Sequence, residues 1–159
     1  MNSMERRPDV DIEEEIELLT RSFAPLKASR GYFNAKSVKG HVKVAGNVRN
    51  PQARRVLLDN IPHIRGVLSC DGTELYDDEM IRFNVGDLLP PGVSATVHYG
   101  AVALTGHLPD GASEDVIKNA VAAVKGVRRV AVALDDEAER QVPLPPRPDK
   151  LEPPTDGQS

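Results

Sequence analysis

The sequence contains an internal repeat at an offset of sixty positions, which restricts the chain to a fold built from two similar units. The segment from Gly40 to Val67 aligns with the segment from Gly100 to Val127 without a gap. Both the glycines and the apolar residues between them keep their register in this alignment. We interpret the repeated glycines as structural residues, and they are Gly40, Gly46 and Gly66 in the first copy and Gly100, Gly106 and Gly126 in the second.

Each copy predicts a strand followed by a helix. The segments 41–48 and 101–108 alternate apolar with other residues, the period of a half-buried strand. Glycine inside a strand marks a bulge or a close backbone approach, a role that we assign to Gly46 and Gly106. The apolar residues that follow have helical spacing and end at a glycine, the residue type that commonly ends a helix in the left-handed conformation.

Further elements on either side complete the unit. An amphipathic helix precedes each copy, and Asp9 and Asp78 are placed to cap the starts of these helices. A strand is expected between this helix and the central strand, with clean alternation over 93–99 and weaker alternation over 32–38. Return strands are expected over 67–71 and 127–134.

The order helix, strand, strand, helix, strand therefore occurs twice. It predicts an α+β fold of two tandem αββαβ modules, each a three-stranded mixed sheet with two helices on one face. We place the first, basic module at 9–73 and the second at 77–135. Because a unit of about sixty residues buries little surface by itself, the modules are expected to pack together and share apolar surface. Residues 136–159 form a Pro-rich tail that we expect to be extended or disordered.

The second copy resembles a BON domain. The family's pattern is a glycine turn, an apolar-x-apolar-x-Gly strand, a helix, a Gly-Val pair and a return strand, and the stretch from Val97 to Pro109, Gly126-Val127 and the strand through Val130 follow it. The first copy follows the same pattern less closely, with Cys70 where an aliphatic residue is usual. We therefore identify the chain as similar to a tandem BON-domain protein. The first copy's matching residues are Gly40, Gly46, Ile61-Pro62, Gly66 and Val67.

This resemblance implies a bacterial, non-enzymatic binding or adaptor module. BON domains are thought to bind phospholipid or other ligands, often in bacterial envelopes, and a related ring-building module occurs in inner-membrane ring components of bacterial secretion systems. The family offers no catalytic residues, so none is assigned here. The implied partners are an anionic phospholipid surface or an acidic protein.

The residues themselves also argue against an enzyme. The sequence has no phosphate-binding loop, no dinucleotide-binding turn and no nucleophile elbow, so we predict no catalysis and no cofactor. Its four histidines lack a paired metal spacing, and a single cysteine cannot complete a zinc site, so no metal is expected. Cys70 and His63 are a conceivable nucleophilic pair, but Cys70 aligns with Val130, and a buried thiol is usually inert.

An acidic run follows the first copy. It extends from Asp71 to Glu79 and lacks the alternating pattern of a calcium loop. We interpret it as a solvated linker followed by a helix cap.

Basic residues are concentrated in the first copy. Between Arg21 and Val67 there are ten Lys and Arg residues and one acid, Asp59, which gives a local charge of +9 in a chain of net charge −4. Such asymmetry favours an anionic partner or electrostatic self-association. Neutralisation by the acidic residues at 13–17 is the alternative. The predicted binding residues are Lys36, Lys39, Lys43, Arg49, Arg54 and Arg55.

Two other classes of function stay open. A small-ligand or cation sensor for potassium or calcium is one, because glycine-bounded loops offer backbone carbonyl groups. A self-assembling structural protein, and hence a homo-oligomer, is the other, because three-stranded sheets leave edges that can pair. Nucleic acid is not an expected partner, since the chain has no aromatic platform and is acidic overall.

The sequence shows no secretory signal at its start and no apolar segment long enough to span a bilayer. These features predict a cytoplasmic protein that can lie peripherally at a membrane.

Overall fold

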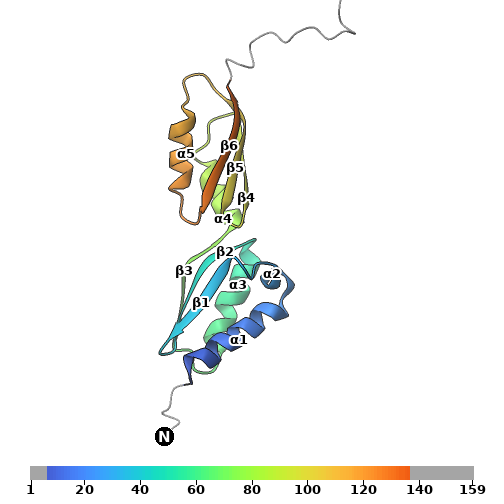
Figure 1. The fold of residues 1–159 in the computed structure, drawn as a ribbon, viewed down its shortest axis with the longest axis vertical. Helices are drawn as coiled ribbons and strands as arrows, with labels where there is room; N and C mark the ends of the chain where they lie inside the picture. The colour runs from blue at the N-terminus through green and yellow to red at the C-terminus, as the bar shows by residue number, and fades with distance from the viewer. Residues whose placement is uncertain (1–6, 137–159) are drawn as a thin grey trace, which may run out of the picture.

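The structure is a computed structural model that describes residues 7–136 (Figure 1). Two units lie end to end along the long axis, and each follows the order helix, strand, strand, helix, strand, which confirms the predicted fold class. The first unit contains α1 (Asp9–Ser22), α2 (Ala24–Ala28), β1 (Phe33–Val38), β2 (His41–Val48), α3 (Pro51–Asn60), the 3₁₀ helix η1 (Ile61–His63) and β3 (Ser69–Asp77). The second unit contains α4 (Asp78–Gly86), β4 (Val93–His98), β5 (Ala101–Leu108), α5 (Glu114–Ala122) and β6 (Arg129–Asp136). The predicted Pro-rich tail, apart from Asp136, lies outside the described residues.

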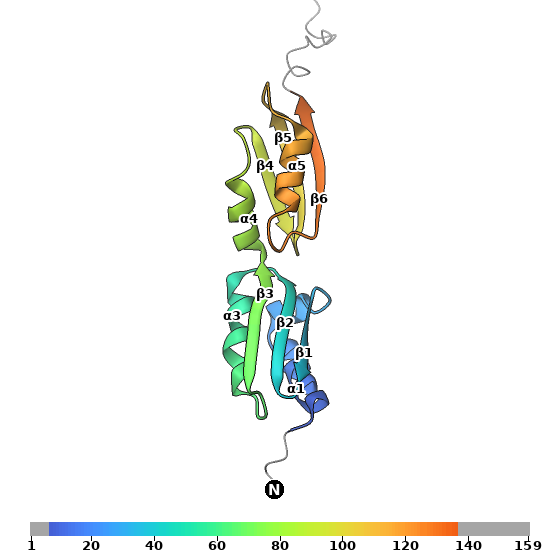
Figure 2. The ribbon, with the colours of Figure 1, turned by 90° about the vertical axis from the view of Figure 1, so that its left-hand side faces the viewer.

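The two sheets have the same topology. Their strand orders are β1-β2-β3 and β4-β5-β6. In each sheet the first two strands form an antiparallel hairpin, and the last strand runs parallel to the central one. The two main helices of each unit cover one face of its sheet and leave the other face open (Figure 2).

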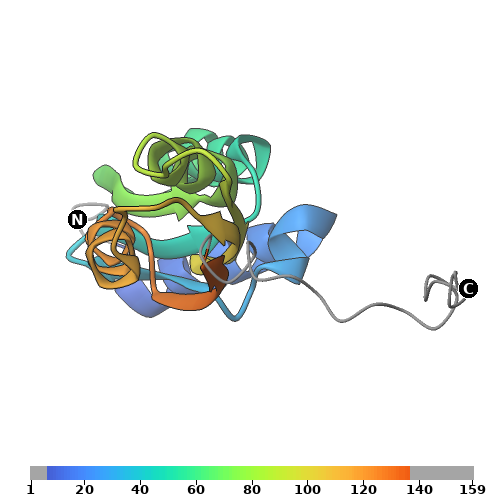
Figure 3. The ribbon, with the colours of Figure 1, turned by 90° about the horizontal axis from the view of Figure 1, so that it is seen from above.

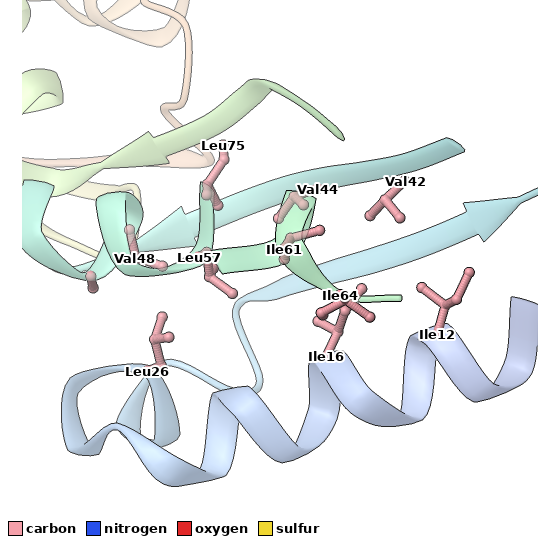
Figure 4. Close-up of a cluster of buried hydrophobic side chains, with 11 residues drawn as sticks. Ile12, Ile16, Leu26, Val42, Val44, Val48, Leu57, Ile61, Ile64 and Leu75 are labelled. Atoms are coloured by element: carbon pink, nitrogen blue, oxygen red, sulfur yellow. The ribbon is translucent and has the colours of Figure 1, made fainter. Parts of the chain in front are cut away.

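Each unit has its own hydrophobic core. In the first unit Ile12 and Ile16 of α1 pack against the covered face of β2, which carries Val42, Val44 and Val48 (Figure 4). The second core is a separate cluster that includes Ile81, Val85, Val102, Leu104, Ile117 and Val121. The expectation that the modules share apolar surface is correct in part, because Tyr76 of β3 packs against the second core. Apart from this contact, each sheet is covered by helices of its own unit.

The connection between the units contains no linker residue. β3 ends at Asp77, and α4 begins at Asp78. Asp77 also caps α4, because its carboxylate accepts a hydrogen bond from the Met80 backbone N–H at 2.8 Å. Asp77 and Asp78 are only 4% and 5% exposed, so the prediction of a solvated linker is wrong. The last strand of the first unit also continues past position 73, where we placed the module's end, since the side chain of Leu75 belongs to the first core.

The second unit is rotated about the long axis relative to the first. Its first helix, α4, is the counterpart of α1, yet it lies on the side of the molecule that carries α3 (Figures 2 and 3). α3 and α4 are also in contact. The units are therefore related by a translation along the long axis combined with a rotation.

All six repeated glycines have positive φ, between +80° and +128°. Gly46 and Gly106 show why two of them occur inside strands. The residue after each, Asn47 or His107, donates its backbone N–H to the carbonyl of Tyr32 or Gly92. A Cβ on either glycine would collide with that same carbonyl oxygen. The close backbone approach that we expected there accounts for both positions.

Candidate interaction surfaces

The six predicted binding residues fall into two groups. Lys36 and Lys43 are directly opposite each other in the β1–β2 hairpin, and both are exposed on the open face of the first sheet. Lys39 lies in the turn of the same hairpin, at the end of the molecule away from the second unit (Figure 1). Lys43 Nζ is 3.3 Å from Glu74 Oε1 on β3, and both side chains are more than half exposed. The three lysines therefore belong to one hairpin, and Lys43 has acidic neighbours on β3.

The three arginines lie elsewhere. Arg49 pairs with Asp78 of the second unit at 2.6 Å. Arg54, on α3, donates to the backbone carbonyls of Leu75 and Gly72. Arg55 is exposed on α3, which covers the opposite face of the sheet from the lysines. The structure therefore groups the lysines and separates the arginines from them.

Two glutamates of the acidic helix α1 form ion pairs with arginines and not with the three lysines. Glu15 pairs with Arg7, and Glu17 pairs with Arg21 of the same helix. Glu13 accepts a hydrogen bond from the Ser37 backbone N–H at 2.8 Å. Asp9, the first residue of α1, contacts the turn that carries Lys39 through the Lys39 backbone N–H.

The end of the first hairpin carries exposed apolar side chains beside the lysines. We call Val38, Lys39, Gly40 and Leu68 the free tip. Val38 is 57% exposed and Leu68 is 62% exposed. Leu68 is held at the turn because its backbone N–H donates to Gly40 O at 2.7 Å. Arg65, three residues before Leu68, is also exposed.

Sequence reasoning missed the two apolar residues of the free tip. Val38 was counted only as a strand residue, and Leu68 only as part of a return strand. The repeat contained a signal, because the residues sixty positions later are His98 and Arg128. An apolar residue whose counterpart is polar indicates a position that the fold does not require to be buried.

An aspartate holds the turn of the free tip. Lys39 and Gly40 have φ values of 54° and 86°, the left-handed pair typical of a tight hairpin turn. The Asp9 carboxylate accepts hydrogen bonds from the Lys39 N–H at 2.8 Å and the Gly40 N–H at 3.0 Å. It also accepts from the Ser37 hydroxyl at 2.7 Å. Asp9 therefore fixes the hairpin turn through its side chain, and the expectation that it caps its own helix is corrected.

The second unit repeats this arrangement at the junction between the units. Tyr99 and Gly100 have φ values of 49° and 80°, and their N–H groups donate to the Asp78 carboxylate at 2.7 and 3.0 Å. Asp78 is likewise not the cap of α4, since that role belongs to Asp77. The third donor differs between the units. Arg49 of the first unit takes the place of the Ser37 hydroxyl, because the residue that corresponds to Ser37 is Val97.

We call His98, Tyr99, Gly100 and Arg128 the docked tip, because it lies against the first unit. The Tyr99 ring stacks on Tyr32 with centroids 3.8 Å apart and planes 2° apart. The Tyr99 hydroxyl lies 3.2 Å from the Ser29 hydroxyl, and Arg128 lies over the Tyr32 ring. The two units therefore contact each other through aromatic and charged groups.

Two further contacts close the junction. Asn47 Nδ2 donates to Gly126 O at 2.9 Å, and Asn47 is 3% exposed. Arg49 also donates to Val97 O at 3.0 Å. Because these bonds supplement a connection without a linker, they fix the orientation of the second unit on the first.

A groove of about 600 Å³ lies between α1 and the α3–η1 segment of the first unit. Leu18, Leu19 and Ile64 contribute apolar groups to it, whereas Asp11 and Glu14 contribute acidic ones. His63 lies in this groove, and Cys70 lies on β3, where it packs against the first core. Burial, with a contribution from Asp71, raises the pKa of the Cys70 thiol. A thiol with a raised pKa is a poor nucleophile.

Residues 7–136 contain no group of three or more His, Cys, Asp or Glu side chains arranged to hold a metal ion. Over the same residues, no helix has both the length and the apolar character required to cross a bilayer.

The fold defines a class of small α+β proteins in which three-stranded mixed sheets are covered by helices on one face. The family model of the BON domain matches residues 77–135, so one BON domain is found in the chain, in its second unit. No curated protein matches the sequence.

Solved structures show the same architecture over most of the chain. One is the C-terminal domain of CdsD, described as the structural protein of the type III secretion system of Chlamydia trachomatis. It has 14% identity and a TM-score of 0.66, and the match covers 81% of this chain and 67% of that one. A second CdsD structure from the same organism has 13% identity and a TM-score of 0.66, with 86% and 69% covered. At these identities the likeness concerns the fold alone.

Proposed function

We propose that this protein is a non-catalytic module that binds an anionic phospholipid surface through the free tip. The observation that carries the proposal is the pairing of exposed apolar side chains, Val38 and Leu68, with adjacent lysines. Lysines next to such a surface attract anionic headgroups, and the apolar side chains enter the region beneath the headgroups.

The energetics of such a surface predict weak binding that depends on salt. Each Lys or Arg close to an anionic membrane contributes about 1 kcal/mol, and the contribution decays within a Debye length. Transfer of an exposed Val or Leu side chain out of water contributes about 1.5–3 kcal/mol when the side chain is fully buried. Lys36 and Lys39 together with the two aliphatic side chains therefore account for a reversible attachment, to which Lys43, paired with Glu74, contributes less.

The comparisons support this choice of partner without fixing it. BON domains are linked to phospholipid binding, and the structural neighbours belong to a secretion system. The match lies in the second unit, whose own tip is occupied at the junction. We propose that the first unit, predicted as a module over 9–73, is a second BON-like module beside the one at 77–135. It has the same order of elements, the same sheet topology and the same aspartate-held turn, and its tip is the free one.

A vesicle sedimentation experiment tests the proposal. The full chain is mixed with vesicles of phosphatidylcholine alone or with a phosphatidylserine fraction, at low and at high salt. We expect binding to the anionic vesicles at low salt, which is lost on Lys36→Glu/Lys39→Glu substitution. Val38→Ser/Leu68→Ser should weaken binding at both salt concentrations, because its effect is not electrostatic.

The matched control is Lys27→Glu/Arg55→Glu, which changes the net charge by the same amount at exposed positions away from the free tip. This control should keep most of the binding. If both charge variants lose binding equally, net charge explains the attachment and the tip does not. If the wild-type chain does not bind anionic vesicles, the phospholipid proposal is wrong, and an acidic protein becomes the remaining anionic partner.

A further inference from the structure

The outer edges of the two sheets differ in their protection. β3 and β6 occupy corresponding positions as the last strands of their sheets. An outer strand carries unpaired backbone N–H and C=O groups, which pair readily with another strand unless something blocks them. In the first unit the edge of the last strand is protected, and in the second unit it is not.

The edge of β3 is blocked. A register shift between Lys43 and Ala45 places an extra β3 residue in the ladder, and such a bulge disrupts further pairing. Arg54 of α3 then donates to two edge carbonyls, Leu75 O at 2.8 Å and Gly72 O at 3.1 Å. Leu58, also on α3, packs closely against Gly72.

The edge of β6 has none of these protections. Its pairing with β5 runs without a register shift from Arg129 to Asp136. The counterparts of Arg54 and Leu58 are Glu114 and Lys118, both exposed, and neither side chain has a hydrogen bond or ion pair within the described residues. β6 forms the outer border of the second sheet in Figure 2.

The direction of the unpaired backbone groups follows from one hydrogen bond. The Arg128 N–H donates to Gly100 O at 2.7 Å, so it points toward β5. Backbone groups alternate in direction along a strand. The N–H and C=O groups of residues 129, 131, 133 and 135 therefore point away from β5, toward the open edge. None of these residues is proline, so each has an N–H to donate.

We propose that β6 pairs antiparallel with β6 of a second copy of this chain, about a two-fold axis at Val132. In this register residue 129 lies opposite residue 135 of the second copy, and residue 131 lies opposite 133. All these residues present outward backbone groups, so each can both donate and accept. The two sheets then join into one six-stranded sheet with the helices of both copies on the same face.

The sequence of β6 is self-complementary in this register. Arg129 lies opposite Asp135 of the second copy, and the symmetry repeats that pair. Arg129 has no ion pair among the described residues, and the Asp135 side chain is 65% exposed although it lies 3.5 Å from His107. Between the charged pairs, Ala131 lies opposite Ala133, small side chains that do not obstruct the approach. Opposite-charge pairs across strands stabilise a sheet.

Neighbouring arrangements lose this complementarity. A shift by two residues in one direction places Arg129 opposite Ala133. A parallel arrangement in register places each charge opposite the same charge of the second copy. β3 has no equivalent pattern, because its exposed charges, Asp71 and Glu74, are both acidic.

Charge reversal gives a specific test with the full chain. Arg129→Asp and Asp135→Arg each convert both attractive pairs of the dimer into repulsive ones, so we expect either change to raise the dimer dissociation constant by about a hundredfold. A mixture of the two variants restores both pairs in a heterodimer. Sedimentation velocity over a wide concentration range should therefore show dimers for the wild type and for the mixture, and monomers for each variant alone.

The control is Asp87→Arg, an exposed charge reversal on the same unit but away from β6, which should dimerise like the wild type. Circular dichroism shows whether each variant is folded. Dimers in the mixture show that both variants still have an intact β6 edge that can pair. A wild-type chain that stays monomeric throughout, or single variants that dimerise as well as their mixture, would overturn the proposal. The test uses no lipid, so its outcome is independent of the function proposed for the free tip.

Discussion

The free tip and the docked tip have the same backbone and opposite environments. Both turns have two successive left-handed residues, and both donate their N–H groups to an aspartate in the first turn of a helix. One tip carries Lys39 and exposed aliphatic side chains. The other carries Tyr99, which stacks on the preceding unit.

This difference shows which residues of a duplicated unit specify its fold and which specify its contacts. The glycines, the aspartates and the buried valines are repeated because each unit needs them. The residues at positions 38, 39 and 68 differ from those at 98, 99 and 128, because the fold does not depend on them. Side chains at these positions are free to determine what each tip binds.

The largest expected effect distinguishes the two aspartates. Asp78→Ala leaves the Tyr99 and Gly100 N–H groups without an acceptor at a site that is 5% exposed. It also removes the partner of Arg49, which is 42% exposed and keeps its bond to Val97 O, so we expect a loss of about 2–4 kcal/mol. Asp9→Ala removes the corresponding turn contacts at a half-buried site that has no arginine partner, and should cost less, about 1–2 kcal/mol. Urea unfolding of both variants measures the difference.

An equal loss of unfolding free energy in the Asp78→Ala and Asp9→Ala variants would contradict the difference that we infer between the two tips. It would indicate that the turn contacts alone, and not the added contacts of Asp78 at the junction, determine the loss of stability. Asp59→Ala, a change at an exposed acid on α3, is the control and should have little effect.

The repeat made most of the fold predictable. The strands expected over 41–48 and 101–108 have the same bounds in the structure. They were predictable because alternation, glycine position and a second copy all gave the same answer. The return strand expected over 67–71 extends instead over Ser69–Asp77, because the bulge after Asp71 interrupts the alternation and hides the continuation through Leu75.

The candidate surfaces were less predictable. Counting charges located the basic segment but not the face on which each side chain lies, so Arg54 was grouped with lysines from which the sheet separates it. The role of Asp78 was missed because an acidic residue at a helix start also suits a cap, and its partners lie about twenty residues away in the chain. Local patterns carry no signal for such contacts.

The glycines that follow the second helix of each unit, Gly66 and Gly126, have different surroundings. A Cβ at Gly126 would lie 2.7 Å from Cγ of Tyr76 and 2.9 Å from Cδ1 of Ile81, in a backbone with φ +93°. We expect Gly126→Ala to cost about 3 kcal/mol, from left-handed strain and overpacking together. At Gly66 the nearest neighbour is Arg7, which precedes α1 and can shift more easily, so Gly66→Ala should cost about 2 kcal/mol.

Gly111→Ala separates the two causes. Gly111 has φ +85° with no atom within 4 Å of an added Cβ, so its substitution tests left-handed strain alone and should cost about 1 kcal/mol. Thermal unfolding of the three variants gives the order. If Gly126→Ala is as stable as Gly111→Ala, Tyr76 and Ile81 can move to accommodate the added Cβ, and the junction is less tightly packed than described above.

The smallest expected effect concerns Cys70, whose counterpart in the second sheet is Val130. Burial raises the pKa of the Cys70 thiol, and the unfolded chain has no such burial. As pH rises through the unfolded pKa, the unfolded state therefore loses its proton first, and the folded state is destabilised relative to it until the folded pKa is passed. Cys70→Val removes this group and matches the residue that the second unit already uses.

The valine variant should thus be about as stable as the wild type near pH 7 and should lose less stability between about pH 7 and about pH 10. Lysines and tyrosines titrate in this range in both proteins, so the difference between the two urea-unfolding series isolates the thiol. Parallel series would show that Cys70 ionises as easily in the folded protein as in the unfolded chain. In that case the thiol of Cys70 would be more accessible than its packing against the first core indicates.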